Sequence, residues 1–526
     1  MKADVKTYPS IFNDVIGPVM RGPSSSHCAA ALRIGRLARD LMDGRIEEVL
    51  VEFDSQGALA TTHQSHGSDM GLFGGLLGLE AADDRLKASA HLLQAAGIKV
   101  KIEIAALGDK HPSTYRLTLR NAAERHTLTA ISTGGGMIEV TEIDGAQVSL
   151  AGDYYETLIY LDAGGEEALQ FLRDNTAADE ILLLRSAGAS IIEIKAQDFL
   201  DEKIVAQLNK RQAIKRLKKL SPVLPVLSRR DMSVPFITCQ ELLAYNKGKD
   251  LQLWELAARY ESARGNLSPA QVLQKMKELV LIMQTSIHEG LAGTRYADRI
   301  LGYQSGLFRT RMEDKQLLDG GLLNRMILYV TALMEIKSSL GVIVAAPTAG
   351  ACAGLPGACI GAAEALGLSA DEMAQGLLAA GMIGVFIAAH STFAAEVCGC
   401  QAECGAASGM AAAALVTLAK GTAKQALSAS SLALQSTLGM VCGPVANRVE
   451  VPCLGNNVLA AANAFACANM ALADYDPVIP LDEVIETMDR VGKSLPHELR
   501  CTALGGLSIT QTSKAIEERL KQHGAA

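Results

Sequence analysis

The second half of the chain consists of long apolar segments with helical periodicity, and this pattern limits the fold more than any other feature. From about residue 236 onward these segments are rich in Ala and Gly, and aromatic residues make up only 4% of the whole chain. Small side chains allow helices to pack closely. The predicted helices cover residues 242–259, 270–289, 322–337, 370–389, 408–419, 456–472 and 482–491. We therefore expect an all-α domain over residues 236–526.

The first part of the chain has a different pattern, in which apolar and polar residues alternate. Residues 46–54 and 99–105 show the period of a half-buried strand, and helical stretches lie at about 28–42 and 83–96. Shorter strands are expected near residues 115–120, 127–132 and 137–141. The chain is therefore expected to be multidomain, with an N-terminal α+β domain over residues 1–153.

Residues 154–200 repeat the mixed pattern on a smaller scale. A strand-like segment and a helical segment come first, and residues 180–186 and 190–196 are then expected to form a hairpin around Gly188. A small ACT-like α+β segment is one interpretation of this pattern. Residues 201–235 follow as a basic, proline-containing linker, which is either a solvated helix leading to the prolines or an anionic docking patch.

The charge and the N-terminal sequence narrow the partners of the protein. A net charge of −8 gives no electrostatic attraction to nucleic acid or to an anionic membrane. The first residues lack the apolar core of a signal peptide, so we expect a cytoplasmic protein with reduced thiols. The apolar stretch from Gly376 to Val397 has the length of a membrane span, but its Ala and Gly content favours a buried core helix.

Cysteines are concentrated in the helical half, and three of them lie in its glycine-rich breaks. Cys400, Cys442 and Cys453 are separated by 42 and 11 residues. Cys442 precedes Gly-Pro and Cys453 follows a proline, so neither is expected within a helix. Thiolates on such turns can point at one soft metal centre. On spacing alone, buried structural thiols and a structural zinc site are alternatives, although the sequence has no CxxC pair of the kind typical of zinc sites.

Phrases spread over most of the chain carry a specific resemblance. In the second half they are GCQAE (399–403), VCGPVANRVEVPC (441–453), LRCTALGGL (499–507), APTAG (346–350) and ASGMAAAA (407–414). In the first half they are GPSSSH (22–27), TTHQSHGSD (61–69) and STGGGMIEV (132–140). In this order the chain resembles the iron–sulfur-dependent L-serine dehydratases, as a single-chain form in which a β region precedes an α region.

The resemblance implies a [4Fe-4S] cluster held by Cys400, Cys442 and Cys453, with one iron left open to substrate. That iron would polarise the β-hydroxyl of L-serine while a base removes the Cα proton, and the products would be pyruvate and ammonia. The implied enzyme is a lyase that uses no pyridoxal phosphate, acts on a small amino acid and forms a homodimer. Cys398 and Cys404 flank Cys400 but are not expected to be ligands.

The resemblance also points to active-site residues outside the cysteine phrases. His27 and His66 are the candidate catalytic acid or base, and a core or helix-capping role is the alternative. If they act on a cluster held by the helical half, the site lies where two domains meet. The candidates for substrate binding are Ser24, Ser25, Ser26 and Thr348. N-capping of a helix is the alternative for the serines, and a simple turn is the alternative for the threonine.

Four departures from the family pattern affect the expected pocket. Gly443 replaces a common Asp, Gly455-Asn456 replaces a basic pair, and Phe393-Ala394 replaces a Ser-Gly phrase. The tail KQHGAA has no cysteine, where some relatives cap the open iron with one, so we expect water or substrate to hold that iron.

There are three alternatives to a serine dehydratase, and the departures near the expected pocket bear on the first of them. One is a lyase of the same family that acts on another β-substituted amino acid, such as cysteine or threonine. The others are a non-catalytic amino-acid-binding regulatory protein and a structural zinc protein. Retention of all three cluster cysteines argues against the regulatory protein.

Overall fold

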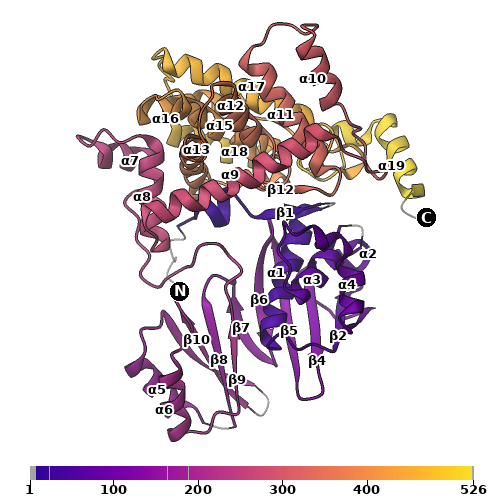
Figure 1. Cartoon of the computed structure of the whole chain (residues 1–526), viewed down its shortest axis with the longest axis vertical. Helices are drawn as coiled ribbons and strands as arrows, with labels where there is room; N and C mark the ends of the chain where they lie inside the picture. Colours follow the sequence, from indigo (N-terminus) through magenta and orange to yellow (C-terminus); the bar gives the residue numbers. More distant parts are fainter. Residues whose placement is uncertain (1–7, 23, 65, 163, 187–188, 524–526) are drawn as a thin grey trace. The chain divides into compact units, whose positions relative to one another are not determined.

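The computed structural model describes residues 8–22, 24–64, 66–162, 164–186 and 189–523 (Figure 1). The chain forms two compact units. The sheet unit spans Met20–Met232, and the helical unit comprises the chain from Ser233 together with the residues up to Val19. The expected division into an N-terminal region with sheets and a C-terminal helical region is confirmed. That the described residues 8–19 belong to the helical unit was not predicted from the sequence.

The sheet unit contains a six-stranded sheet with the strand order β3-β2-β4-β5-β6-β7. β2 and β3 are parallel, and the other neighbours are antiparallel. The strands are β2 (Glu48–Asp54), β3 (Lys99–Ala105), β4 (Thr114–Arg120), β5 (Arg125–Gly134), β6 (Met137–Ile143) and β7 (Ala146–Leu150). The predicted strands correspond to all of these except β7, which was not predicted.

Two helices of the sheet unit, α1 (Ser25–Leu41) and α3 (Ser68–Leu77), pack together at backbone distance. A Cβ atom added to Gly71 would lie 2.2 Å from the carbonyl oxygen of Cys28, so only glycine fits at this crossing. The contact brings the N-terminal turns of both helices side by side. The predicted helix over 83–96 is instead a 3-10 turn followed by a shorter helix, and the remaining short elements are α2 (Leu59–Thr62), η2 (Asp84–Ala88) and α4 (Ser89–Ala95).

A second sheet in this unit has four antiparallel strands in the order β11-β8-β10-β9. Its elements are β8 (Tyr155–Leu161), α5 (Glu166–Asn175), β9 (Glu180–Ser186), β10 (Ala189–Ala196), α6 (Glu202–Arg211) and β11 (Arg216–Leu220). One face packs under α5 and α6, and residues of the other face belong to the same apolar core as the six-stranded sheet. The expected pairing of β9 with β10 is present, while Gly188 lies outside the described residues.

The segment expected as a basic linker is part of this second sheet. Residues 216–220 form β11, which pairs with β8, so they are not the solvated linker helix predicted from their lysines. Lys218 is buried, and its Nζ lies 2.8 Å from Asp43 Oδ2 and 2.7 Å from Glu124 Oε1. The prediction of an exposed linker was wrong because the partners that neutralise the charge of Lys218, Asp43 and Glu124, lie far away in the sequence.

The helical unit is built around α13 and α15, which pack against each other (Figure 1). Every residue of α15 is buried, and small side chains make this possible. The helices are α7 (Cys239–Asn246), α8 (Leu253–Gly265), α9 (Pro269–Ala292), α10 (Ser305–Glu313), α11 (Leu322–Lys337), α12 (Gly354–Ala365), α13 (Ala370–His390), α14 (Ala395–Cys398), α15 (Cys404–Leu418), α16 (Ala423–Gln435), α17 (Cys453–Leu472), α18 (Leu481–Ser494) and α19 (Gln511–His523). Short elements of this unit are the π-helix η1 (Ile11–Val15), the strand β12 (Val342–Val344), and the 3-10 turns η3 (Cys400–Ala402), η4 (Val445–Asn447), η5 (His497–Leu499) and η6 (Gly506–Ile509). The short strand β1 (Val19–Arg21) begins at Val19, and its other two residues belong to the sheet unit.

Two predictions about these helices have different outcomes. The single helix expected over 242–259 is wrong: the chain leaves the helix between α7 and α8, where Gly248 and Asp250 both have positive φ. Among the described residues, α13 alone is long and apolar enough to cross a membrane. Of its most apolar window 78% is buried inside the protein, as expected of a core helix.

Candidate functional site

Cysteine thiols from separate parts of the helical unit meet in one place. Cys400, Cys404 and Cys442 are buried and belong to one apolar group, against which the partly exposed Cys501 packs. Burial raises the pKa of the Cys453 thiol, and the nearby charges of Glu403, Cys400 and Cys501 raise it further, so Cys453 lies close to the group. The structure therefore brings together the three predicted ligands and two further cysteines.

The local structure explains why these thiols can converge. Cys400 begins the 3-10 turn η3, and Cys404 and Cys453 are the first residues of α15 and α17. Cys442 and Cys501 lie on irregular segments. None of the five lies in the middle of a helix, as the neighbouring glycines and prolines predict for Cys442 and Cys453.

Hydrogen bonds make Cys400 the centre of the group. Its sulfur accepts bonds from the thiols of Cys404 and Cys442, and Asn456 Nδ2 donates to it over 3.3 Å. These donors lower the pKa of Cys400 well below its usual value, while the same bonds raise the pKa values of Cys404 and Cys442. Cys442 is also hydrogen-bonded to Cys501. The group therefore stabilises negative charge on sulfur.

The chemistry of this donor set fits an iron–sulfur cluster. Soft thiolates in an apolar, buried setting are the ligands such clusters take. Among the described residues, no group of three or more His, Cys, Asp or Glu side chains has the geometry to hold a metal ion. A four-iron cluster is larger than one ion, so the thiols that hold it must lie further apart.

Asn457 ties two of the surrounding loops together. Its Nδ2 donates to the carbonyl oxygens of Gly350 and Cys453, each over 2.8 Å. Its Oδ1 accepts the backbone N–H groups of Ala353 at 3.2 Å and Gly354 at 2.7 Å. This fully buried amide thus connects the APTAG loop to the start of α17, where Cys453 lies.

Thr348 of the APTAG loop contacts a buried carboxyl group that was not among the predicted site residues. The Thr348 hydroxyl donates to Glu403 Oε1 over 2.5 Å and accepts the N–H of Ala351 over 3.2 Å, so it also makes the turn. Burial and the charge of Cys400 raise the pKa of Glu403 to about 8. Glu403 lies in the phrase GCQAE, which is the signal that could have identified it.

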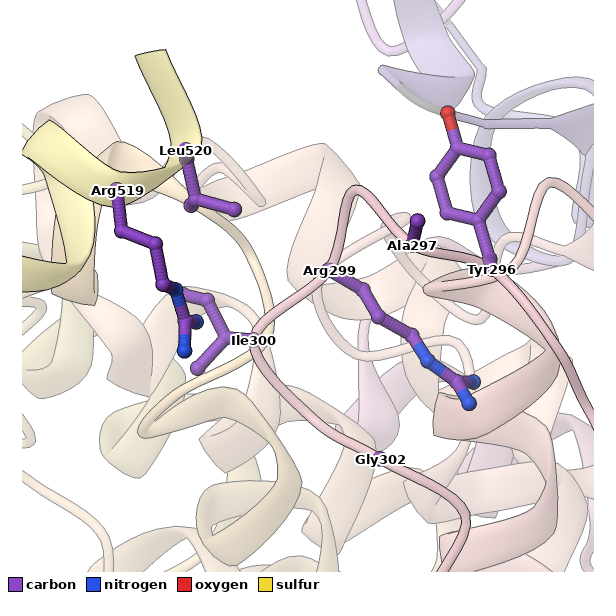
Figure 2. A pocket seen from close by; sticks show the side chains of 7 residues that line it. All are labelled: Tyr296, Ala297, Arg299, Ile300, Gly302, Arg519 and Leu520. Atoms are coloured by element: carbon purple, nitrogen blue, oxygen red, sulfur yellow. The ribbon is translucent and has the colours of Figure 1, made fainter. Parts of the chain in front are cut away.

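The segment before Cys453 is fixed by a second buried carboxylate. Glu450 Oε2 accepts the backbone N–H groups of Ile300 and Leu301, each over 2.9 Å. The 300–302 loop lines a pocket of about 270 Å³, shown in Figure 2. The pocket is lined by Tyr296, Ala297, Arg299, Ile300, Gly302, Arg519 and Leu520. None of these residues was predicted to be part of the site.

The departures near the cysteines have distinct structural settings. A Cβ atom at Gly443 would lie 3.1 Å from the backbone nitrogen of Leu507, so a neighbouring segment closely approaches this glycine. A Cβ at Gly455 would meet nothing within 4 Å. Cys398, excluded as a ligand from the sequence, has its sulfur 4.0 Å from the carbonyl oxygen of Asp489 on α18.

In the sheet unit, the two histidine phrases lie side by side at the starts of α1 and α3. The rings of His27 and His66 have centroids 4.7 Å apart. Ser24 Oγ lies 2.7 Å from His27 Nδ1, and the Ser24 N–H donates to the His66 carbonyl oxygen over 3.3 Å. Pro23 and Ser65, which belong to the same phrases, lie outside the described residues.

The serines do not have the capping role considered as an alternative. Ser24 occupies the N-cap position of α1, but its side chain makes no capping hydrogen bond because the hydroxyl is bonded to His27. Ser25 is buried and Ser26 is half-buried in the first turn. These placements leave substrate binding by the serines a prediction.

A third histidine in the same phrase was missed. His63 Nδ1 lies 2.8 Å from both carboxylate oxygens of Asp69. Burial raises the pKa of Asp69, which makes the contact with His63 the main interaction favouring its charged form. The phrase TTHQSHGSD contains both residues, so their spacing was visible, but not their contact.

Comparisons with known proteins agree with this arrangement. The family described as "Serine dehydratase alpha chain" matches residues 248–508, which include all five cysteines. The "Probable L-serine dehydratase, alpha chain" of Bacillus subtilis is 33% identical over 285 residues, covering 54% of this chain and 95% of the relative. The "Probable L-serine dehydratase, beta chain" of the same organism is 34% identical over 220 residues, covering 41% and 99%.

A single-chain relative extends the match to nearly the whole molecule. The "L-serine dehydratase" of Helicobacter pylori is 28% identical over 500 residues, which cover 93% of this chain and 96% of the relative. The present chain thus matches an alpha chain, a beta chain and a single-chain relative over nearly its whole length. It belongs to the L-serine dehydratase family, in the single-chain form.

Proposed function

We propose that this protein is an L-serine ammonia-lyase that binds a [4Fe-4S] cluster through Cys400, Cys442 and Cys453 and converts L-serine into pyruvate and ammonia. The likeness to a protein named L-serine dehydratase over 93% of the chain supports the reaction. The observation that carries the cluster assignment is the convergence of buried thiols around Cys400.

The residues around the thiols fit this role. When bound, the cluster supplies a Lewis acid that assists departure of the β-hydroxyl group. Asn456 donates to the Cys400 sulfur, and Asn457 fixes the loop that contains Thr348 against the start of α17. Burial of the three cysteines at 2%, 6% and 5% exposure excludes water from the sulfurs. These residues therefore hold and shield the cluster.

We assign proton transfer to the histidine pair of the sheet unit. The hydroxyl of Ser24 is hydrogen-bonded to Nδ1 of His27 and fixes the orientation of the ring. The other ring nitrogen, Nε2, is therefore the atom that we assign to proton transfer. The adjacent ring of His66 stabilises this orientation by contact at 4.7 Å. A neutral imidazole nitrogen held in position can accept the Cα proton as a general base.

We also propose that residues 155–220 form an ACT-like domain. The element order β8-α5-β9-β10-α6-β11 and the four-stranded antiparallel sheet with two helices on one face support this assignment. The domain would include β11, which extends it beyond the segment expected from the sequence.

The test of the proposed function is an activity assay on the full-length protein after anaerobic reconstitution with iron and sulfide. L-Serine should yield pyruvate and ammonia in equal amounts, and the Cys442→Ser variant should yield neither. Cys467→Ser, which changes a buried cysteine on α17 that is not in the group, is the matched control.

The same assay separates the alternatives. Ammonia release from L-cysteine or L-threonine, but not from L-serine, would reject serine as substrate and retain the lyase. An intact cluster that binds L-serine without forming product would favour a regulatory protein. A protein that takes up zinc but no iron would reject the cluster.

A further inference from the structure

Cys501 differs from the other cysteines in exposure and in position. It is half-buried, whereas the other ten cysteines of the chain are buried. Its thiol is hydrogen-bonded to that of Cys442, and it packs against the apolar group that contains Cys400. Cys501 therefore lies at the outer side of the thiol group, in direct contact with one of the predicted ligands.

The segment that carries Cys501 is built onto the Cys442 loop. The N–H of Cys442 donates to the carbonyl oxygen of Leu499 over 2.8 Å. On the far side, Ser508 Oγ donates to the carbonyl oxygen of Pro444 over 2.8 Å. Bonds on both sides of Cys501 thus fix its backbone against the loop that holds the predicted ligand.

Gly443 makes this close approach possible. A Cβ atom at this position would lie 3.1 Å from Leu507 N, a contact tighter than side chains normally make with backbone. Any larger residue would press on the segment that runs from Cys501 to Ser508. The absence of a side chain at Gly443 and the presence of the thiol at Cys501 therefore belong to one arrangement.

Cys404, the other additional thiol, is placed for a different role. It is 1% exposed, begins α15, and Asn457 Nδ2 lies 3.6 Å from its sulfur. Its thiol also donates to Cys400. Cys404, which begins a helix and contacts two neighbours, therefore supports Cys400. The half-buried side chain of Cys501 can instead turn toward the group or away from it while its backbone stays fixed.

We propose that Cys501 is a fourth sulfur ligand, which occupies the iron that Cys400, Cys442 and Cys453 leave open and which substrate displaces. This inference rests on the proposed function, since it requires the cluster. Ligation forms one Fe–S bond and releases the thiol proton to solvent, and no electron is transferred. On displacement that bond breaks and the sulfur leaves as a thiolate, which takes up a proton.

Mössbauer spectroscopy of protein reconstituted with ⁵⁷Fe tests the ligand directly. In the wild type all four irons should show sulfur coordination, and in Cys501→Ala one iron in about four should shift to a spectrum with a non-sulfur ligand. Cys501→Ser should give a shift of the same site through its oxygen. Cys398→Ser, in which the changed cysteine packs on α18, should match the wild type.

Alkylation with iodoacetamide, read by mass spectrometry, tests displacement. Labelling of Cys501 should be about tenfold lower or more in the cluster-loaded wild type than in the metal-free protein, because a bound thiolate is protected. Addition of L-serine to the loaded protein should restore the labelling.

The outcomes separate this inference from the proposed function. Failure of the wild type to take up iron and sulfide would reject the proposed function itself. A loaded wild type whose spectrum equals that of Cys501→Ala would overturn the fourth ligand and leave the proposed function standing. Loss of the whole cluster from both Cys501 variants, with Cys398→Ser still loaded, would overturn a displaceable role.

Discussion

The thiols around Cys400 in the helical unit and the carboxyl pair Glu156 and Glu193 in the sheet unit are both groups of buried ionisable side chains. Both carboxyl side chains are 1% exposed, and none of their four oxygens has a hydrogen-bond partner. The nearest cation is Lys195, whose Nζ lies 3.9 Å from Glu193 Oε1. Cys400, by contrast, accepts bonds from two thiols and an amide.

The difference shows that burial alone does not make a binding site. Around Cys400 the donors lower the pKa of the thiol despite burial, so the charged form is stable and ready to bind a cationic centre. Around Glu193 burial outweighs the attraction of Lys195, and the pKa rises to about 7. Here the neutral form is favoured, and the pair acts on stability.

Replacement of a predicted ligand should give the largest effect, and it tests whether the thiols around Cys400 form a binding site. In Cys400→Ser, Cys442→Ser and Cys453→Ser, we expect iron content and activity to fall by about 100-fold or more, because each change removes one sulfur ligand from the cluster. Visible absorption and pyruvate assays measure this loss. Full activity in any one of these variants, with Cys467→Ser as the control, would contradict the assignment.

The histidine pair should come next, since it is a half-buried polar pair that we assign to chemistry without metal binding. For His27→Asn and His66→Asn we expect kcat to fall by about 100- to 10,000-fold for the residue that moves the proton, with iron content unchanged. Steady-state kinetics and iron counting on the same samples separate the two effects. Unchanged kcat in both variants would show that the pair is structural.

The carboxyl pair should give a pH effect on stability. Because folding raises the pKa of Glu193, the native state holds more protons than the unfolded state, and stability falls as pH rises from about 4.5 to about 7. The loss should be on the order of 3 kcal/mol for opening of β8 and β10. Lys195 and Glu180, which face the pair, set the size of the effect.

Hydrogen exchange read by mass spectrometry at pH 5 and pH 7.5 measures this opening. Glu193→Gln should remove the part of the slope that Glu193 contributes, because the amide cannot ionise. The double variant Glu156→Gln/Glu193→Gln should remove most of the slope, because burial also raises the pKa of Glu156. Glu167→Gln, an exposed change on α5, should leave it unchanged. An equal slope in Glu193→Gln and the wild type would show that the pair is not responsible.

Asn457→Ala should give the smallest effect, and it tests whether the residues around the thiols help to retain the cluster. Loss of the bonds to Gly350, Ala353, Gly354 and Cys453 should loosen the loops and weaken cluster retention by about 10- to 100-fold. Iron release to a chelator measures retention. Release as slow as in the wild type would remove Asn457 from the supporting residues.

The features that could be predicted from the sequence are those written in local patterns. Helical periodicity gave the bounds of α11 without error, and glycine and proline neighbours placed Cys442 and Cys453 outside helix interiors. Family phrases joined Cys400 to them. The same local phrases placed His27 and His66 in segments that the structure brings together.

The features that could not be predicted depend on contacts between distant segments. Cys501 joins the thiols only because its segment pairs with the Cys442 loop, and no local pattern reports that pairing. Lys218 looked like a linker residue because its partners lie far away in the sequence. Glu403 stood in a recognised phrase, but its contact with Thr348 is visible only in three dimensions.

The central claim is that the thiols around Cys400 hold a four-iron cluster, and a count of iron and inorganic sulfide tests it most directly. After anaerobic reconstitution and removal of unbound metal, the wild type should contain about four of each per chain. The variant in which Cys400, Cys442 and Cys453 are all serine should contain almost none. Equal, low iron in both proteins would contradict the account.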